Sequence, residues 1–174
     1  MPRFLIALLA LTAAAGPAVA ETRYLAYDAS NRITQALTRG VTLEADRGLF
    51  GSISVRRIIS TSQRGAADIR RGGPGAVRGV LPAGSDERTI YHITPEGDGR
   101  PLSRALCPGS DEVWLVAGRV KLGHPLTLHA VGRWPDGAYR HCVQLTYDWR
   151  GEWAMPPARG LDDSGAPVGA PVGR

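Results

Sequence analysis

Two cysteines and four histidines are the side chains of this 174-residue chain best suited to nucleophilic chemistry or metal binding. Cys107 and Cys142 lack the Cys-x-x-Cys spacing of metal and redox sites, so the pair predicts one disulfide in an oxidising compartment. A free Cys142 would instead be a thiol that His129, on a neighbouring strand, activates or with which it shares a metal. The disulfide removes that role, and we expect no metal, no cofactor and no catalytic residue. His141 lies on the apolar face of its predicted strand, where we expect a hydrogen-bonded core histidine. The remaining histidines are His92 and His124.

The carboxylates offer one weak site. Asp111 and Glu112 are adjacent, so in a strand they point to opposite faces and do not act together. Asp148 and Glu152 are better spaced, and aromatic residues beside carboxylates are typical of sugar-binding or glycosidase surfaces. The alternative is that these aromatics close the core. They are Tyr147, Trp149 and Trp153.

Four arginines form the strongest binding candidate. Arg64, Arg70, Arg71 and Arg78 lie in residues 62–87, a segment rich in Gly, Arg and Ala that shows no periodicity. Such a long aperiodic segment is functional or disordered, and it predicts a flexible loop. Guanidinium groups bind phosphate or carboxylate in a bidentate manner. We therefore expect contact with an acidic glycan, a lipid headgroup or an envelope protein.

The recognised catalytic motifs are absent from the sequence. It contains no G-x-S-x-G elbow, no H-E-x-x-H, no P-loop and no EF-hand loop. Nucleic acid is also disfavoured, because the chain has no motif that interleaves aromatic and basic residues. These absences favour a binding protein over an enzyme.

The elements that must position these residues are mostly strands, because apolar and polar residues alternate with a period of two along much of the chain. Residues 33–45 alternate apolar and polar, which predicts a long strand with a bulge near Gly40. The alternative is a short helix over residues 31–39, capped by Ser30; the threonines favour the strand. A second strand is predicted over residues 49–61. Its phase slips at residues 56–57, which indicates a bulge or a shift between sheets.

Further strands are predicted in the second half of the chain. The tetrapeptide from Trp134 to Gly137 predicts a hairpin turn. A two-residue loop pairs Ala130 with His141 and unites the apolar faces, whereas a three-residue loop shifts the register by one. We favour the two-residue loop, which places His129 opposite Cys142. The strands are expected over residues 89–93, 101–106, 113–120, 126–131 and 138–150.

The pattern predicts an antiparallel β-sandwich. Seven or eight short strands, turns between most of them, little helix and one disulfide resemble the architecture of immunoglobulin-like domains. A small β-barrel is the alternative. Residues 21–154 are expected to form this single domain, and the Pro/Gly/Ala-rich residues 155–174 to be a disordered tail.

The first twenty residues predict export. Arg3, an apolar run and the small residues Ala18 to Ala20 have the layout of a secretory signal peptide over residues 1–20. No other stretch approaches the roughly 20 apolar residues of a membrane-spanning helix. Lys121 is the single lysine among 21 basic residues, a bias typical of GC-rich bacteria. We therefore expect a periplasmic or secreted protein.

Charge adds only a weak preference. The formal charge of +5 at pH 7 falls by one when Arg3 leaves with the leader, which favours anionic surfaces modestly. The sequence thus predicts a non-catalytic binding or accessory protein of the bacterial envelope. The alternative is a small periplasmic hydrolase or sugar-binding protein, the hydrolase using His129 or His141 with Asp136 or Asp148.

Overall fold

The computed structural model describes residues 21–48, 51–94 and 99–154. The signal peptide predicted for residues 1–20 and the tail predicted for residues 155–174 lie outside the described residues. In chain order the elements are β1 (Glu21–Ala29), α1 (Arg32–Leu37), β2 (Gly40–Arg47), β3 (Ile53–Ser60), β4 (Ala66–Arg71), α2 (Ala76–Gly79), β5 (Thr89–Ile93), α3 (Gly99–Leu106), β6 (Glu112–Ala117), β7 (Leu126–Arg133) and β8 (Tyr139–Trp153).

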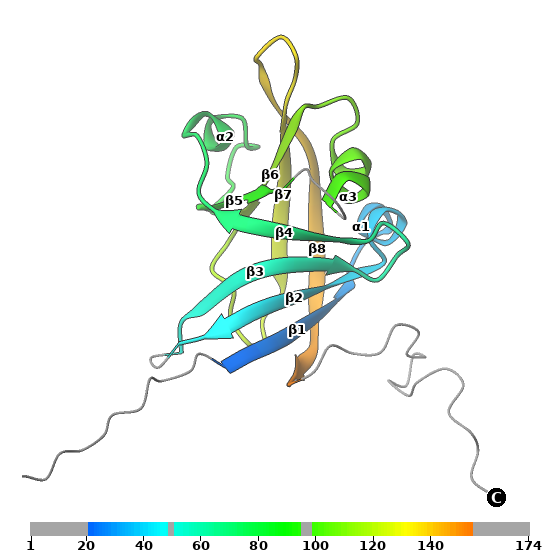
Figure 1. Ribbon diagram of the computed structural model, residues 1–174, viewed down its shortest axis with the longest axis vertical. Coiled ribbons are helices and arrows are strands. Elements are labelled where there is room, and N and C mark those ends of the chain that lie inside the picture. Colours follow the sequence, from blue (N-terminus) through cyan, green and yellow to red (C-terminus); the bar gives the residue numbers. More distant parts are fainter. Residues whose placement is uncertain (1–20, 49–50, 95–98, 155–174) are drawn as a thin grey trace, which may run out of the picture.

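The strands form one antiparallel sheet that closes into a barrel, each strand pairing with the next and β8 with β1 (Figure 1). The predicted sandwich is therefore wrong, and the alternative of a small barrel is confirmed. The reason lies in β8, which is 15 residues long. Its first part pairs with β7 and its last part, from Tyr147 to Trp153, pairs with β1. One strand that reaches both neighbours closes the sheet and leaves no second sheet to pack against.

Three β-bulges bend the strands of the barrel. The register shifts leave Arg56 as the extra residue of β3, and Cys142 and Arg150 as extra residues of β8. A bulge bends its strand and increases the local twist, which helps a small sheet to close. The phase slip at residues 56–57 predicted either a bulge or a change of sheet, and the bulge is confirmed.

The hairpin between β7 and β8 differs from the predicted one. Trp134 N donates to Ala138 O at 3.0 Å, and these residues close a three-residue loop whose Gly137 has φ 79°. The favoured two-residue loop is therefore wrong. The bulge at Cys142 then shifts the register again, so that apolar inward residues still meet. The resulting pairs are Ala130–Val143, Leu128–Leu145 and Leu126–Tyr147.

The first half of the strand predicted over residues 33–45 is wrong, because the alternative helix, α1, forms there. Asn31, not Ser30, caps it: Asn31 Oδ1 accepts a hydrogen bond from Thr34 N at 2.8 Å. Two of the three threonines that favoured a strand, Thr34 and Thr38, are instead buried and bonded to β8, whereas Thr42 lies in β2. Those bonds are Thr146 N to Thr34 Oγ1 at 3.0 Å and Thr38 Oγ1 with the Tyr147 hydroxyl at 3.1 Å.

The strand predicted over residues 101–106 is also wrong, because this segment forms α3. Leu102 and Leu106 lie four residues apart on one helical face, and both are buried in the barrel core. Pro101 is tolerated because it lies in the first turn, where its missing N–H has no partner to lose. The predicted disulfide is confirmed: Cys107 follows α3 directly and is bonded to Cys142 of β8.

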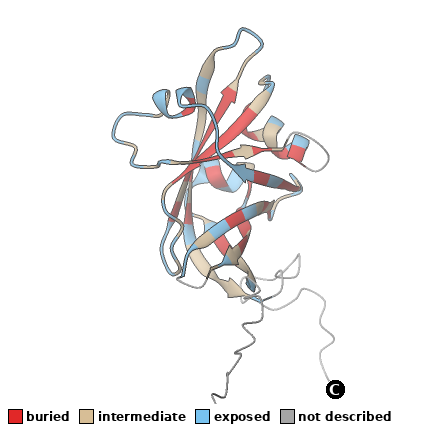
Figure 2. Cartoon of the chain, turned by 60° about the vertical axis from the view of Figure 1, so that its left-hand side comes forward, coloured by how far each residue is buried: buried red, intermediate tan, exposed pale blue. Residues whose placement is uncertain are grey.

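The inside of the barrel is filled by apolar side chains. Buried residues occur on every strand, where they form the red bands of Figure 2, and most of them belong to this core. Two spaces lined by inward residues measure about 10 Å³ each. A space of that size holds about one water molecule, so neither accommodates an organic ligand. The outer surface is therefore where this structure offers binding groups.

None of the described helices is long and apolar enough to span a membrane.

Candidate functional site

The four arginines predicted to bind are all exposed, but they do not lie on one loop. Arg64 lies in the turn after β3. Arg70 and Arg71 end β4, and Arg78 belongs to α2. The segment predicted to be a loop, residues 62–87, thus contains a strand and a helix. The pattern missed β4 because two of its three buried residues are alanines, which signal a strand weakly.

The chain after β4 lies across the outside of the barrel. Val77 of α2 is fully buried in an outer apolar cluster that is separate from the barrel core. Its partners are Ile90 of β5, Trp114 and Val116 of β6, and Val131 of β7. These residues alternate along their strands with inward residues, so they point outward. We name residues 70–88 the arginine segment.

Gly73 allows this segment to lie flat on the sheet. A Cβ added at Gly73 would stand 2.6 Å from Ile90 Cγ2 and 2.9 Å from Trp114 Cδ1. Distances below 3.0 Å between such atoms are not tolerated, so any larger residue displaces the segment or the ring of Trp114. The position of the segment therefore depends on a glycine that the sequence pattern did not single out.

An open depression of about 380 Å³ lies within the arginine segment. It is lined by Arg78, Leu81, Pro82, Ser85 and Arg88. Arg88 Nη1 donates to the carbonyl oxygens of Ser85 and Glu87, each at 2.9 Å, so the loop holds its guanidinium. The hydroxyl of Ser85 donates to Pro82 O at 2.8 Å. Of the described residues that line the depression, two carry a guanidinium group and none carries a carboxylate.

The two guanidinium groups of this depression form no ion pair with a carboxylate of the described residues. Among the described residues, neither Arg78 nor Arg88 forms an ion pair, and neither do Arg70 and Arg71. Several arginines elsewhere on the barrel do pair with carboxylates. These include Arg23, Arg47, Arg56, Arg133, Arg140 and Arg150. The arginine segment therefore presents positive charge that is available to an external anion.

A buried histidine anchors the end of the arginine segment. His129 of β7 is 1% exposed. Its Nε2 lies 3.2 Å from Glu87 Oε2, and its Nδ1 lies 3.1 Å from His141 Nε2 of β8. We name His129 and His141 the imidazole pair. In the pairing of β7 with β8, Gln144 lies opposite His129. The predicted pairing of His129 with Cys142 is therefore wrong.

The two hydrogen bonds of His129 determine which ring nitrogens carry a hydrogen when both imidazoles are neutral. An ionised Glu87 only accepts, so His129 Nε2 carries the hydrogen and donates to it. His129 Nδ1 is then an acceptor, and His141 Nε2 donates to it. Burial, and then the charge of His129, lower the pKa of His141 below its usual value. In the neutral pair the two facing nitrogens thus share one hydrogen, which lies on His141 Nε2, and the unshared lone pair is that of His141 Nδ1.

Sequence reasoning found both histidines but missed their partner. Glu87 lies 42 residues from His129 and inside the aperiodic segment, so no spacing in the sequence links the two. His141 was predicted to be a hydrogen-bonded histidine on the inward apolar face of its strand. It is hydrogen-bonded, but the bulge at Cys142 turns it to the outer surface, where it is half-buried.

The remaining histidines and the predicted acidic partners lie apart from this pair. His92 packs on Trp114, with ring centroids 5.3 Å apart, and His124 is exposed in the turn before β7. Asp136 pairs with Arg140 at the tip of the hairpin, 2.5 Å away. Asp148 is exposed, on the part of β8 that pairs with β1.

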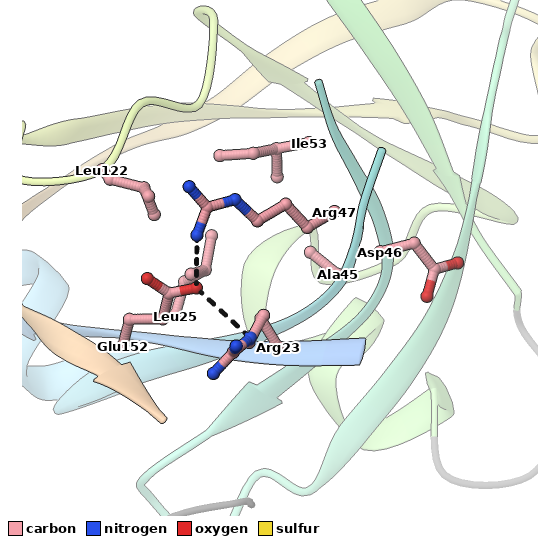
Figure 3. Close-up of a pocket in the computed structure, with 8 residues that line it drawn as sticks. All are labelled: Arg23, Leu25, Ala45, Asp46, Arg47, Ile53, Leu122 and Glu152. Atoms are coloured by element: carbon pink, nitrogen blue, oxygen red, sulfur yellow. Dashed lines mark ion pairs between the residues drawn. The ribbon is translucent and has the colours of Figure 1, made fainter. Parts of the chain in front are cut away.

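Glu152 belongs to a cluster that closes one end of the barrel, not to a sugar site with Asp148. Its Oε1 lies 3.7 Å from both Arg23 Nε and Arg47 Nη1, as the dashed lines in Figure 3 show. The ion pairs lie over Leu25, Ile53 and Leu122, which line one of the spaces of about 10 Å³. Trp149 packs edge-on against the buried Tyr27, with ring centroids 5.2 Å apart.

Within the described part of the chain, no group of three or more His, Cys, Asp or Glu side chains is arranged as a complete metal site. Comparison of the chain with protein-family models, curated proteins and solved structures gives no significant match. The arginine segment and the imidazole pair are therefore the two features whose geometry bears on function.

Proposed function

We propose that this chain is a non-catalytic binding module that holds anionic groups on the arginine segment. The observation that supports it best is the depression of about 380 Å³ in which Arg78 and Arg88 have no carboxylate partner among the residues that the structure describes. Guanidinium groups that share one depression and form no ion pair with a described residue suit phosphate or carboxylate, which accept two parallel hydrogen bonds from each fork.

The lining of the depression also indicates the class of ligand. Leu81 and Pro82 provide apolar contact beside the two guanidinium groups, and Ser85 adds a hydroxyl. That combination fits a charged group attached to a carbon skeleton better than a free inorganic ion. We therefore propose a phosphate- or carboxylate-bearing glycan or glycolipid of the bacterial envelope as the ligand. The export signal predicted for residues 1–20 supports a periplasmic or secreted location for this interaction.

The alternative of a small hydrolase finds less support. A hydrolase of this kind needs a nucleophile or an activated water next to a base. Among the described residues, the hydrogen bonds of the imidazole pair go only to each other and to Glu87. The acidic partners predicted for it, Asp136 and Asp148, lie elsewhere. A sugar-binding surface built on Asp148 and Glu152 is likewise not favoured, because Glu152 closes the barrel end.

Binding to vesicles tests the proposal. We would measure binding of the purified protein to vesicles that contain lipid A, and to neutral phosphatidylcholine vesicles. The variant Arg78→Gln/Arg88→Gln should bind lipid A at least roughly tenfold more weakly, because each charged hydrogen bond contributes about 1.5–3 kcal/mol. The control is Arg32→Gln/Arg104→Gln, which removes the same charge from two exposed arginines outside the segment.

The two variants separate a site from a general charge effect. If the control binds as weakly as the segment variant, the attraction comes from net charge and the proposed site is wrong. Equal binding to neutral vesicles would also contradict it. If lipid A is not bound, an acidic polysaccharide and then an acidic envelope protein are tested with the same pair of variants.

A further inference from the structure

We propose that the imidazole pair is a binding site for a divalent transition metal, with Zn²⁺ as the reference ion. His129 Nδ1 and His141 Nε2 would be the protein ligands, and Glu87 would hold the ring of His129 from its far side. This site is distinct from the depression between Arg78 and Arg88, and its test does not depend on anion binding.

The two nitrogens already have nearly the separation that a shared metal requires. Zn²⁺ binds imidazole nitrogen at about 2.0–2.1 Å, so two ligands of a tetrahedral ion stand roughly 3.4 Å apart. His129 Nδ1 and His141 Nε2 are 3.1 Å apart, and their ring centroids are 5.2 Å apart with the planes at 56°. An opening of about 0.3 Å, within the freedom of the half-buried His141, admits the ion between them.

The carboxylate of Glu87 prepares His129 as a ligand. Metal-binding histidines commonly donate their second ring N–H to a carboxylate, which fixes the tautomer and makes the ligating nitrogen more basic. Glu87 Oε2 lies 3.2 Å from His129 Nε2, and the two side chains are only 15% and 2% exposed. This bond leaves the lone pair of His129 Nδ1 facing His141, so His129 keeps its tautomer when it binds a metal. His141 changes its tautomer: its ring hydrogen moves from Nε2 to Nδ1, and Nε2 is then free to ligate.

The site is open on the side of β8. His141 is half-buried while His129 is enclosed, so an ion reaches the pair from the His141 side. Two protein ligands leave coordination positions to water or to an external donor, since the described residues hold no third histidine, cysteine or carboxylate in a metal-binding group. Imidazole ligands suit Zn²⁺, Cu²⁺ and Ni²⁺ and do not suit Mg²⁺ or Ca²⁺.

Metal titration of the untagged protein tests the site. After removal of metal with a chelator, calorimetric titration with Zn²⁺ should show one equivalent bound, and Mg²⁺ should show none. His141→Gln should weaken the binding of Zn²⁺ at least tenfold, because it removes a ligand. Glu87→Gln should weaken it roughly 10–100-fold, the range measured for such supporting carboxylates. The matched controls are His92→Gln and His124→Gln, which lie outside the pair.

Spectroscopy makes the test independent of folding effects. His129→Gln is expected to destabilise the protein because His129 is buried, so His141→Gln carries the test. With Cu²⁺ in place of Zn²⁺, electron paramagnetic resonance should show coupling to two imidazole nitrogens in the wild type and to one in His141→Gln. The proposal is overturned if the wild type binds no Zn²⁺, if His141→Gln binds it equally well, or if a control histidine variant loses it.

Discussion

At the scale of single residues, Tyr27 and Tyr147 are two buried tyrosines whose hydroxyls differ in hydrogen bonding. Both side chains are 1% exposed inside the barrel. The Tyr147 hydroxyl shares a hydrogen bond with Thr38 Oγ1, whereas the Tyr27 hydroxyl has no partner among the described residues. Tyr147→Phe should therefore lower the free energy of unfolding by about 0.5–1.5 kcal/mol, and Tyr27→Phe should leave it unchanged or raise it. Urea unfolding of both variants measures the difference; equal losses would contradict it.

Buried tyrosines also make the protein sensitive to alkaline pH. Burial raises the pKa of Tyr27 from 10.0 to about 12, and burial raises the pKa of Tyr147 as well. Below the unfolded pKa of about 10 both states keep the proton. Above it the unfolded chain loses the proton first, so this stability is lost as the pH rises from about 10 to 12, by up to about 1.4 kcal/mol per pH unit for one such group.

Urea unfolding at several alkaline pH values checks this expectation. The unfolding free energy should fall with rising pH in the wild type and fall less steeply in Tyr27→Phe, which has one buried phenol fewer. A spectroscopic titration should show these phenols ionising later than an exposed tyrosine. A slope that is identical in the two proteins would show that other groups cause the alkaline loss.

At the scale of elements, Gly73 holds the arginine segment against the outer face of β5 and β6. Gly73→Ala should move the segment and lower the unfolding free energy by about 1–3 kcal/mol, because the new Cβ meets Ile90 and Trp114. The matched control is Gly75→Ala in the same segment, where a Cβ meets nothing within 4 Å. Thermal unfolding and the fluorescence of Trp114 report the change, and equal behaviour of both variants would contradict this account.

The disulfide ties α3 to β8. Its cysteines are 35 residues apart, and closing a loop of that size stabilises by about 3–4 kcal/mol on the chain-entropy model. Reduction should therefore lower the melting temperature by roughly 10 °C in a domain of this size. The variant Cys107→Ser/Cys142→Ser should melt at the reduced temperature and should not respond to reductant. An unchanged melting temperature after reduction would show that α3 is held by Leu102 and Leu106 alone.

At the scale of the whole molecule, the sequence predicted the class of structure and not its closure. Alternation identifies most strands, since each has one face in the core. It does not distinguish two packed sheets from one closed sheet, because both bury one face of every strand. Closure depends on the pairing of β1 with β8, between strands at opposite ends of the chain. Helices α1 and α3 were mistaken for strands because helices of six and eight residues carry too little periodicity to decide.

The candidate site was predictable only in part for the same reason. Arginine composition pointed to residues 64–78, and the cysteine count predicted the disulfide. The arrangement around Arg88, Glu87 and His129 joins a connection without periodicity to the outer face of a sheet. No local signal encodes such a contact, because it depends on how the barrel closes and on the bulge that turns His141 outward.

A closed barrel has no edge strand, so any strand pair could be the one that opens first. A circular permutant tests whether the order of the strands along the chain decides which pair opens. In the natural order the β1–β8 pair is the one closed without a local connection, so its amides should exchange fastest with solvent among the strand pairs. Tyr24 lies opposite Trp153, so a short glycine–serine linker from residue 154 to residue 21 spans the gap. New ends between Gly123 and His124 fall in an exposed turn and cut the β6–β7 connection instead.

The permutant should fold to the same barrel, with the fast-exchanging pair moved from β1–β8 to β6–β7. Circular dichroism checks the fold and hydrogen exchange with mass spectrometry locates the pair. If the β1–β8 amides still exchange fastest, the weakness of that pair is local, and the bulge at Arg150 is the structural feature that explains it. If they become protected, connectivity decides which part of the sheet opens, because the same residue pairs are present in both proteins and only the covalent link between their strands has changed.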